Sequence, residues 1–369
     1  MSELLYSDVE EEVRASVRGL LGQRSSVSQV LARIENGLPY DQTLWRTLST
    51  EMGLSGMAVP ERFGGGGASL RESAVVLEEL GRSLAPVPFL TSAVIATSAL
   101  LASAAETDEY ANDRADLLAK LAAGDLVAAL ALPWTTASGA AVTPTVSVAG
   151  GALSGQIRSV ADGLAADVLL VPTADGLYAV DATAEGVSRA AVVSMDLTRP
   201  IADITLSGAA GRRVSGSASA VVESALTVGA AMLASEQLGV MEWCVDTTVE
   251  YAKTRYQFGR PIGSFQGLKH RLADLWVDIS QARAAARYAA NCAATGDADL
   301  PVAASVAQAW CSPLAVRAAE ECVQMHGGIG FTWEHPAHLF LKRAKTDAVA
   351  LGNADRHRQV LAGLVDIRL

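Results

Sequence analysis

The spacing of apolar residues changes twice along the chain. In the first 125 positions apolar residues recur every three or four residues, a period typical of amphipathic helices. From about 126 to 216 the pattern becomes short runs rich in β-branched residues, separated by turn pairs such as Gly150-Gly151 and Asp175-Gly176. Helical spacing then returns. The pattern predicts an α+β fold with a helical domain at 1–125, an antiparallel β-barrel or sandwich at 126–216, and a helical bundle at 217–369.

Local signals predict where several elements begin and end. Asp41 is expected to cap a helix, a further helix is expected at 69–83, and the four-glycine loop that ends at Gly67 is interpreted as a structural turn, because no strand precedes it and no Lys-Ser/Thr follows. The expected strands are 127–132, 142–148, 156–160, 168–171, 177–180, 191–195 and 201–206. The expected breaks among the four or five C-terminal helices are Pro301, Pro313, Gly327 and Pro336.

The stretch 251–270 joins the two longest predicted helices. The first is expected to run from about 218 to 258, where Gly259 and Pro261 stop it, and Ser264 is expected to cap the second. The connector presents three side chains beside a helix N-terminus: Arg255, Phe258 and Gln266. A guanidinium and free backbone N–H groups together suit a diphosphate.

Composition and charge narrow the functional classes. The chain has 369 residues, half of them apolar, and a net charge of −11. This charge argues against a nucleic-acid partner, which needs a basic face, whereas an anionic coenzyme needs only a local cationic pocket. The N-terminus lacks the basic segment of a signal peptide, and the most apolar run, 89–105, is short for a membrane span. We therefore expect a cytoplasmic protein with no membrane association.

The four cysteines lie in helical patterns and have no histidine at zinc-finger spacing: Cys244, Cys292, Cys311 and Cys322. They are interpreted as buried thiols, which fits a reducing cytosol, and no metal site is predicted.

Two segments resemble the acyl-CoA dehydrogenases. Residues 255–266 read Arg-x-x-Phe-Gly-x-x-Ile-x-x-Phe-Gln, similar to the FAD-contacting segment of that family, and residues 324–331 read Gln-x-x-Gly-Gly-x-Gly-aromatic, similar to its second signature. The N-terminal sequences Val-Pro-Glu-Arg-Phe-Gly-Gly and Leu-Glu-Glu-Leu-Gly-Arg resemble the family's helical domain. The resemblance implies FAD as cofactor, with six residues reaching the ADP half of a flavin in a neighbouring subunit: Arg255, Phe258, Gln266, Gln324, Gly327 and Gly328.

The residue that would act as catalytic base is missing. The family reaction removes the α-proton of an acyl-CoA thioester and passes the β-hydrogen as hydride to flavin, so it needs a desolvated carboxylate. Counted from the motifs, the family's usual glutamate falls on Leu351, and the position that some members use instead falls on Gly229. Neither accepts a proton, so no catalytic residue is assigned. Four groups stay open as substitutes or active-site groups: Asp347, expected one turn before Leu351 on the same helix face, and Glu236, His335 and His338.

The β region also departs from the family pattern. The family carries an aromatic-x-x-Thr/Ser strand and a Trp-Ile/Val-Thr/Ser strand against the flavin ring. The corresponding places here read Leu132-Pro133-Trp134-Thr135 and Ser159-Val160-Ala161, so the second lacks its tryptophan. The ring-binding half is degraded, while the ADP-reaching segment is intact.

Three hypotheses follow from this imbalance. In the first, the chain resembles the base-lacking subunit of a heteromeric (α2β2) acyl-CoA dehydrogenase that acts on steroid side-chain CoA thioesters. A homologous partner subunit then carries the catalytic glutamate, and an electron-transfer flavoprotein or a similar protein accepts the electrons. In the second, it is a homomeric dehydrogenase with a relocated base such as Asp347. In the third, it is a non-catalytic binding or scaffold member of the family.

Overall fold

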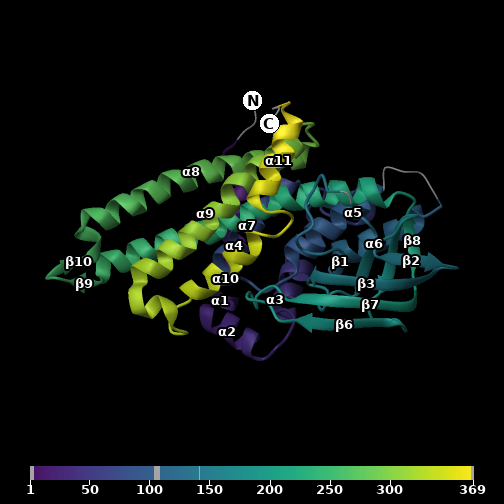
Figure 1. Ribbon diagram of the computed structural model, residues 1–369, viewed down its shortest axis with the longest axis horizontal. Helices are drawn as coiled ribbons and strands as arrows, with labels where there is room; N and C mark the ends of the chain where they lie inside the picture. The colour runs from purple at the N-terminus through teal and green to yellow at the C-terminus, as the bar shows by residue number, and fades with distance from the viewer. Residues whose placement is uncertain (1–3, 104–108, 141, 367–369) are drawn as a thin grey trace.

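A computed structural model describes residues 4–103, 109–140 and 142–366. The body is elongated, with two β-sheets at one end and helices at the other (Figure 1). The N-terminal part is helical as predicted: α1 (Asp8–Arg24), α2 (Val27–Glu35), α3 (Gln42–Arg46), α4 (Leu70–Ser83), α5 (Thr97–Ser103) and α6 (Ala111–Ala123). Short π- and 3₁₀-helical turns lie between them at Thr47–Glu51, Leu54–Gly56, Glu61–Phe63 and Phe89–Ala96.

The predicted cap at Asp41 and the predicted turn are present, and the structure shows a further cap at Ser69. The Asp41 carboxylate accepts from the Leu44 N–H at 2.9 Å, and the Ser69 hydroxyl accepts from the Arg71 N–H at 3.0 Å. The glycine loop folds back on itself, because the N–H groups of Gly66 and Gly67 bond to backbone carbonyls of residues 56 and 59. Those N–H groups are therefore used within the chain, which confirms the structural interpretation of the loop.

The middle region forms two four-stranded sheets that pack as an open sandwich. One has the order β1-β4-β5-β8 and the other β2-β3-β7-β6. The strands are β1 (Ala128–Leu130), β2 (Val146–Ala149), β3 (Ala152–Ala161), β4 (Val168–Pro172), β5 (Leu177–Asp181), β6 (Val187–Val192), β7 (Ile201–Ala210) and β8 (Arg212–Ser215). The sandwich was expected, but the pairing is not purely antiparallel, because β1 runs parallel to β4.

Two strands differ from the predicted runs. The run 191–195 is not a strand beyond Val192, because Val193 and Met195 turn outward into solvent. Strand β8 was not predicted, since its two arginines hide the apolar alternation that marks a strand.

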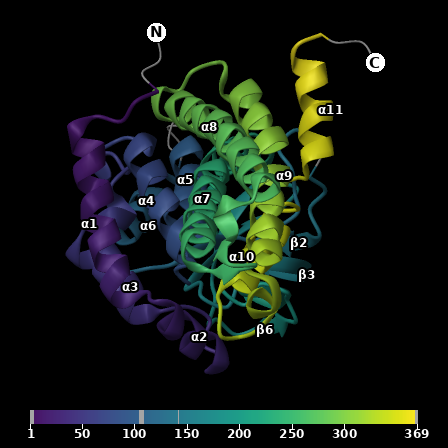
Figure 2. The ribbon, with the colours of Figure 1, turned by 90° about the vertical axis from the view of Figure 1, so that its left-hand side faces the viewer.

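Five helices follow the sandwich within the described residues: α7 (Ala218–Thr254), α8 (Gln266–Thr295), α9 (Leu300–His326), α10 (Ala337–Asp347) and α11 (Ala354–Leu364). Helix α7 lies in the middle of the helical end, packed against α4, α8 and α9 (Figure 2). The backbones of α4 and α7 come so close that a Cβ on Gly239 would lie 1.9 Å from the Glu78 carbonyl oxygen.

Helices α7 and α9 each have one feature whose meaning the sequence alone leaves open. Helix α7 is long and apolar enough to cross a membrane, yet 72% of its most apolar window is buried inside the protein, as in the core helix of a globular fold. Pro313 does not break the chain as predicted but lies inside α9. Its neighbours Ser312 and Leu314 are buried in the core, so packing outweighs the lost hydrogen bond.

A buried ion cluster joins the sandwich to the helices. Arg199, from the segment after β6, bonds Glu236 of α7 at 2.6 Å and Asp347 of α10 at 2.8 Å. Arg343 of α10 bonds Glu236 at 2.6 Å and returns to Asp196 of the same β segment at 2.6 Å. All five side chains are at most 5% exposed. We call these residues the ion cluster.

Because each member of the ion cluster is buried, removing one partner leaves charges without compensation. Arg343→Leu is expected to lower the free energy of unfolding by about 3–5 kcal/mol. Lys345→Leu, two residues away in an exposed pair with Glu320, is expected to cost under about 1 kcal/mol. Urea unfolding followed by circular dichroism measures both, and equal losses in the two variants would contradict the role of the cluster.

Candidate functional site

The connector after α7 is a hairpin rather than a continued helix. Helix α7 ends at Thr254, Arg255 is extended, and β9 (Tyr256–Gln257) pairs antiparallel with β10 (Arg260–Pro261). The two loop residues, Phe258 and Gly259, have φ values of 50° and 75°, the signs that a two-residue hairpin turn requires. The predicted helix end at 258 is therefore wrong, because the apolar period continues into a turn that periodicity alone does not reveal.

Phe258 occupies the tip of this hairpin in a strained conformation. A left-handed backbone costs a non-glycine residue roughly 1–2 kcal/mol. The side chain gains little from burial in return, since it is 90% exposed and touches only the edge of Phe265, at 6.2 Å between ring centroids. Such strain at an exposed aromatic is typical of a position kept for contact with another molecule.

Helix α8 begins at Gln266, and its N-cap is Phe265 rather than Ser264. The Ser264 hydroxyl instead donates to the Pro261 carbonyl at 2.7 Å, so the predicted cap is wrong. Within the described part of the chain, neither the first N–H groups of α8, at Gln266 and Gly267, nor the Arg255 guanidinium has a hydrogen-bond partner.

The second motif lies at the end of α9, where its His326 ring stacks on Tyr251, near the end of α7, at 4.4 Å between centroids. Gln324 is exposed near the end of α9, and Gly327 ends that helix with φ of 62°. A Cβ on Gly327 or Gly328 would meet no atom within 4 Å, so the space beside both glycines is open. We call residues 255–266 and 324–331 the nucleotide edge; it contains all six predicted cofactor residues, whose contacts with FAD stay a prediction.

The two positions expected for a catalytic base face each other in an apolar space. Leu351 is 2% exposed, and a Cβ on Gly229 would lie 3.2 Å from Leu351 Cδ1 and 2.9 Å from Ile95 Cγ1. The remaining cavity beside them has a volume of about 20 Å³. Small-molecule sites usually enclose about 300–1,000 Å³, so this space does not admit an acyl group.

Trp134 holds this space closed. Its backbone N–H donates to the Ser159 carbonyl and its carbonyl accepts from the Leu351 N–H, both at 2.8 Å. Its ring is buried, with the Arg199 guanidinium 5.3 Å from the ring centroid. The two β segments that depart from the family pattern are thereby fastened to each other and to Leu351.

The candidate substitute acids belong to the ion cluster. Asp347 is the last residue of α10 and Leu351 lies in the following turn with φ of 52°, so the expectation that they share a helix face is wrong. Neither Asp347 nor Glu236 lines the cavity beside Leu351. Burial raises the pKa of Asp347 to about 7. Burial also opposes the charge on Glu236, but attraction to Arg199 and Arg343 outweighs it and lowers the pKa of Glu236.

The candidate histidines lie elsewhere. The His335 ring lies 4.1 Å from the His326 ring between centroids, tilted by 33°, and burial together with the charge of His326 lowers the pKa of His335 to about 4. His338 packs edge-on against Trp333 at 4.6 Å. Neither histidine lines the cavity beside Leu351. The four cysteines are buried and free, as predicted.

Comparison with known proteins agrees with this arrangement. Residues 7–125 match the model described as Acyl-CoA dehydrogenase, N-terminal domain, and residues 219–364 match Acyl-CoA dehydrogenase, C-terminal domain. The chain belongs to the acyl-CoA dehydrogenase family. Acyl-CoA dehydrogenases are FAD-dependent flavoproteins, so FAD is the cofactor of the chemistry in which such a chain takes part.

Individual relatives cover the full length of the chain. It is 35% identical to acyl-CoA dehydrogenase IpdE2 of Mycobacterium tuberculosis over 95% of both chains. A chain of the ChsE4-ChsE5 complex from the same species superimposes on this chain with a TM-score of 0.87 at 26% identity, and the alignment covers 100% of this chain and 100% of that one. A steroid acyl-CoA dehydrogenase, the Tcur3481-Tcur3483 G363A variant, gives a TM-score of 0.84 at 31% identity, covering 97% of this chain and 98% of that one.

The two halves of an FAD molecule fit this chain unequally. The nucleotide edge offers an unpartnered guanidinium, free helix N–H groups and open space beside two glycines, all of which suit a diphosphate. The ring half does not fit, because the space beside Leu351 is about 20 Å³. No chemical step is therefore assigned to a flavin ring held by this chain alone.

The raised pKa of Asp347 predicts a pH-dependent stability. The folded protein keeps the proton up to about pH 7, whereas the unfolded chain releases it near pH 4, so this group's contribution to stability falls as the pH rises between those values. Relative to Asp347→Asn, the wild type should lose Tm between pH 4 and pH 7, and the difference between the two proteins should change little above pH 7. Asp278→Asn, at a surface ion pair with Arg317, is the control and should track the wild type. Parallel curves for wild type and Asp347→Asn would contradict the assignment.

Proposed function

We propose that this chain is the subunit without a catalytic base in a heteromeric acyl-CoA dehydrogenase. The complex introduces an α,β double bond into an acyl-CoA thioester, as in β-oxidation of lipids and steroids. This chain contributes the nucleotide edge to the ADP half of FAD, and a homologous partner contributes the glutamate and most of the acyl pocket. One observation carries the proposal: Leu351 and Gly229 close the reaction space, while the nucleotide edge stays exposed.

Exposed apolar side chains support a protein partner. At the nucleotide edge and its neighbourhood Phe258, Phe331 and Trp333 are 59–90% exposed. A second group lies on the outer face of α8 and α9, where Trp276 is 62% and Trp310 41% exposed, and the Trp310 indole N–H donates to the Asp278 carbonyl across the two helices. Clusters of exposed aromatic residues are typical of protein interfaces.

The known relatives suggest the assembly and the substrate class. One neighbour is a complex of two named chains and another is a steroid acyl-CoA dehydrogenase. By analogy the partner is a homologous subunit in an α2β2 complex, the substrate is a steroid side-chain CoA thioester, and the acceptor is an electron-transfer flavoprotein or a similar protein in the cytoplasm.

Two other functions make different demands on the structure. A homomeric dehydrogenase needs a base near the substrate, but Asp347 is ion-paired to Arg199 and lies outside the cavity beside Leu351. A non-catalytic scaffold needs no flavin contact, but the strained, exposed Phe258 favours one. The heteromer accounts for both observations.

Co-expression with a homologous subunit that carries glutamate in the place of Leu351 tests the proposal. Alone, this chain should purify colourless and inactive, because its ring site is closed. The complex should be yellow, contain one FAD per two chains, and oxidise acyl-CoA with a dye acceptor. A yellow, active chain by itself would support the relocated base, whereas a stable complex with neither flavin nor activity would support the scaffold.

The contribution of Arg255 is measured in the assembled complex. Arg255→Ala removes charge-assisted hydrogen bonds to the diphosphate, so the Kd for FAD is expected to rise about tenfold or more. Lys253→Ala, two residues earlier on an exposed turn and paired with Glu250, is the matched control and should leave the Kd unchanged. Equal FAD content in the two variants, with thermal stability maintained, would refute the role of Arg255.

A further inference from the structure

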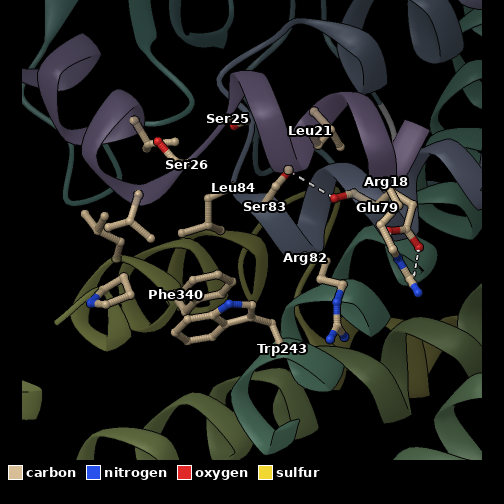
Figure 3. Close-up of a pocket in the computed structure, with 15 residues that line it drawn as sticks. Arg18, Leu21, Ser25, Ser26, Glu79, Arg82, Ser83, Leu84, Trp243 and Phe340 are labelled. Atoms are coloured by element: carbon tan, nitrogen blue, oxygen red, sulfur yellow. Dashed lines mark hydrogen bonds and ion pairs between the residues drawn. The ribbon is translucent and has the colours of Figure 1, made fainter. Parts of the chain in front are cut away.

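A second cavity lies apart from both the closed reaction space and the nucleotide edge. It opens between α1, the start of α2, the end of α4 and the start of α10, and has a volume of about 240 Å³ (Figure 3). A cavity of about 150 Å³ holds a benzene molecule, so this one admits a ligand with a single ring and a short side chain. None of its lining residues belongs to the ion cluster or the nucleotide edge.

One side of the cavity is an aromatic platform. The rings of Trp243 and Phe340 are parallel, with an interplanar angle of 2° and centroids 3.6 Å apart. Leu84 lies above them in Figure 3, and Leu21 and Leu339 complete an apolar wall. A flat apolar ring is the group that such a wall binds best.

The other side of the cavity is cationic. Arg18 and Arg82 both line it, and the only carboxylate among the described lining residues is Glu79. Glu79 is already shared by Arg14 at 2.9 Å and Arg18 at 2.7 Å. The partner of Arg82, Asp246, is 60% exposed and lies outside the cavity lining, so a second anion can share this guanidinium.

A buried hydroxyl at the cavity has no partner among the described residues. Ser25 lies at the turn between α1 and α2, is 7% exposed, and its Oγ makes no hydrogen bond. A buried hydroxyl without a partner costs free energy. The Oγ itself is shielded from solvent, so Ser25 adds an unsatisfied polar group behind the cavity wall, and the arginines provide the charged contacts.

We propose that this cavity is a binding site for a small amphiphilic carboxylate, with its ring against Trp243 and Phe340 and its carboxylate between Arg18 and Arg82. The guanidinium groups supply charge-assisted hydrogen bonds, and the wall supplies apolar burial. Neither element suffices alone, so an uncharged isostere binds more weakly.

The aromatic platform is also the end of a chain of rings that begins at the nucleotide edge. Tyr251 stacks on His326 at 4.4 Å, the His326 and His335 rings are tilted by 33° with centroids 4.1 Å apart, and the His335 centroid lies 6.3 Å from that of Trp243. A ligand in the cavity would therefore touch Trp243, the last ring of a series that leads back to His326, the residue before Gly327. If the proposed function holds, the ligand slows or speeds FAD release in the complex.

Isothermal titration of the full chain with 3-phenylpropionate tests the site, with 3-phenylpropanol as the uncharged isostere. We expect saturable binding of the acid and at least tenfold weaker binding of the alcohol. Gly22→Phe fills the cavity mouth: Gly22 lines it, lies within helix α1, and has no atom within 4 Å of an added Cβ. Gly19→Phe is the matched control, on the same helix with equal space but outside the cavity lining.

The outcomes separate the claims. Loss of binding in Gly22→Phe with retention in Gly19→Phe supports the site, and Arg82→Gln should weaken the acid but not the alcohol. The proposed site is overturned if the acid shows no saturable binding, if the acid and the alcohol bind equally, or if Gly22→Phe binds the acid as well as the wild type does. It is also overturned if Gly22→Phe fails to assemble with the partner subunit, because the cavity would then be a protein contact. These titrations use the chain alone, so they stand whether or not the heteromer forms. If bound acid leaves the rate of FAD release from the complex unchanged, only the link between the cavity and the nucleotide edge is overturned.

Discussion

The pairing of two buried guanidinium groups with carboxylates from different elements determines how the two ends of this protein fit together. Arg199 and Arg343 both bond Glu236, one from the β segment and one from α10, and each reaches a further carboxylate on the opposite element. Charges removed from water are tolerated only while every partner is present. The sandwich and the helices are therefore fixed in one relation, and the surfaces between them cannot separate to admit a ligand without breaking the cluster.

This fixed relation explains the contrast between the two candidate sites. Arg199 also lies over Trp134, whose backbone is bonded to Ser159 and Leu351, so the ion cluster and the closed reaction space support each other. The hairpin of the nucleotide edge follows the C-terminal end of α7, whereas Glu236 lies near the middle of that helix, so the hairpin is free of this constraint. The chain keeps a closed interior and presents a hairpin at which, among the described residues, the Arg255 guanidinium has no hydrogen-bond partner; this is the division expected of a subunit that completes a site elsewhere.

The sequence predicts the helices, the sandwich and the nucleotide edge because each depends on local pattern. The cap at Asp41 and the start of α7 follow from residue type and apolar period. The hairpin after Thr254 was missed because a left-handed Phe258 is disfavoured on its own and is imposed by tertiary context. The break predicted at Pro313 is absent for a related reason, since burial of the neighbouring residues keeps α9 continuous through the proline.

The ion cluster was missed because charged residues are expected at the surface, and nothing in their spacing shows that Arg199 and Arg343 meet the same carboxylate. Glu236 and Asp347 were noticed only as possible bases. The sequence places Leu351 and Gly229 where the family would carry a glutamate, but it could not show that these two positions lie against each other, since they belong to segments far apart in the chain.

That closure has a directional consequence for evolution. A glutamate introduced at position 351 would be pressed against Ile95 and the Trp134 loop with no cation beside it, so the reverse mutation alone would destabilise the fold rather than revive proton abstraction. Regaining chemistry requires several coordinated replacements, none advantageous by itself. Because the space beside Leu351 and Gly229 is filled, no single substitution restores proton abstraction at this position.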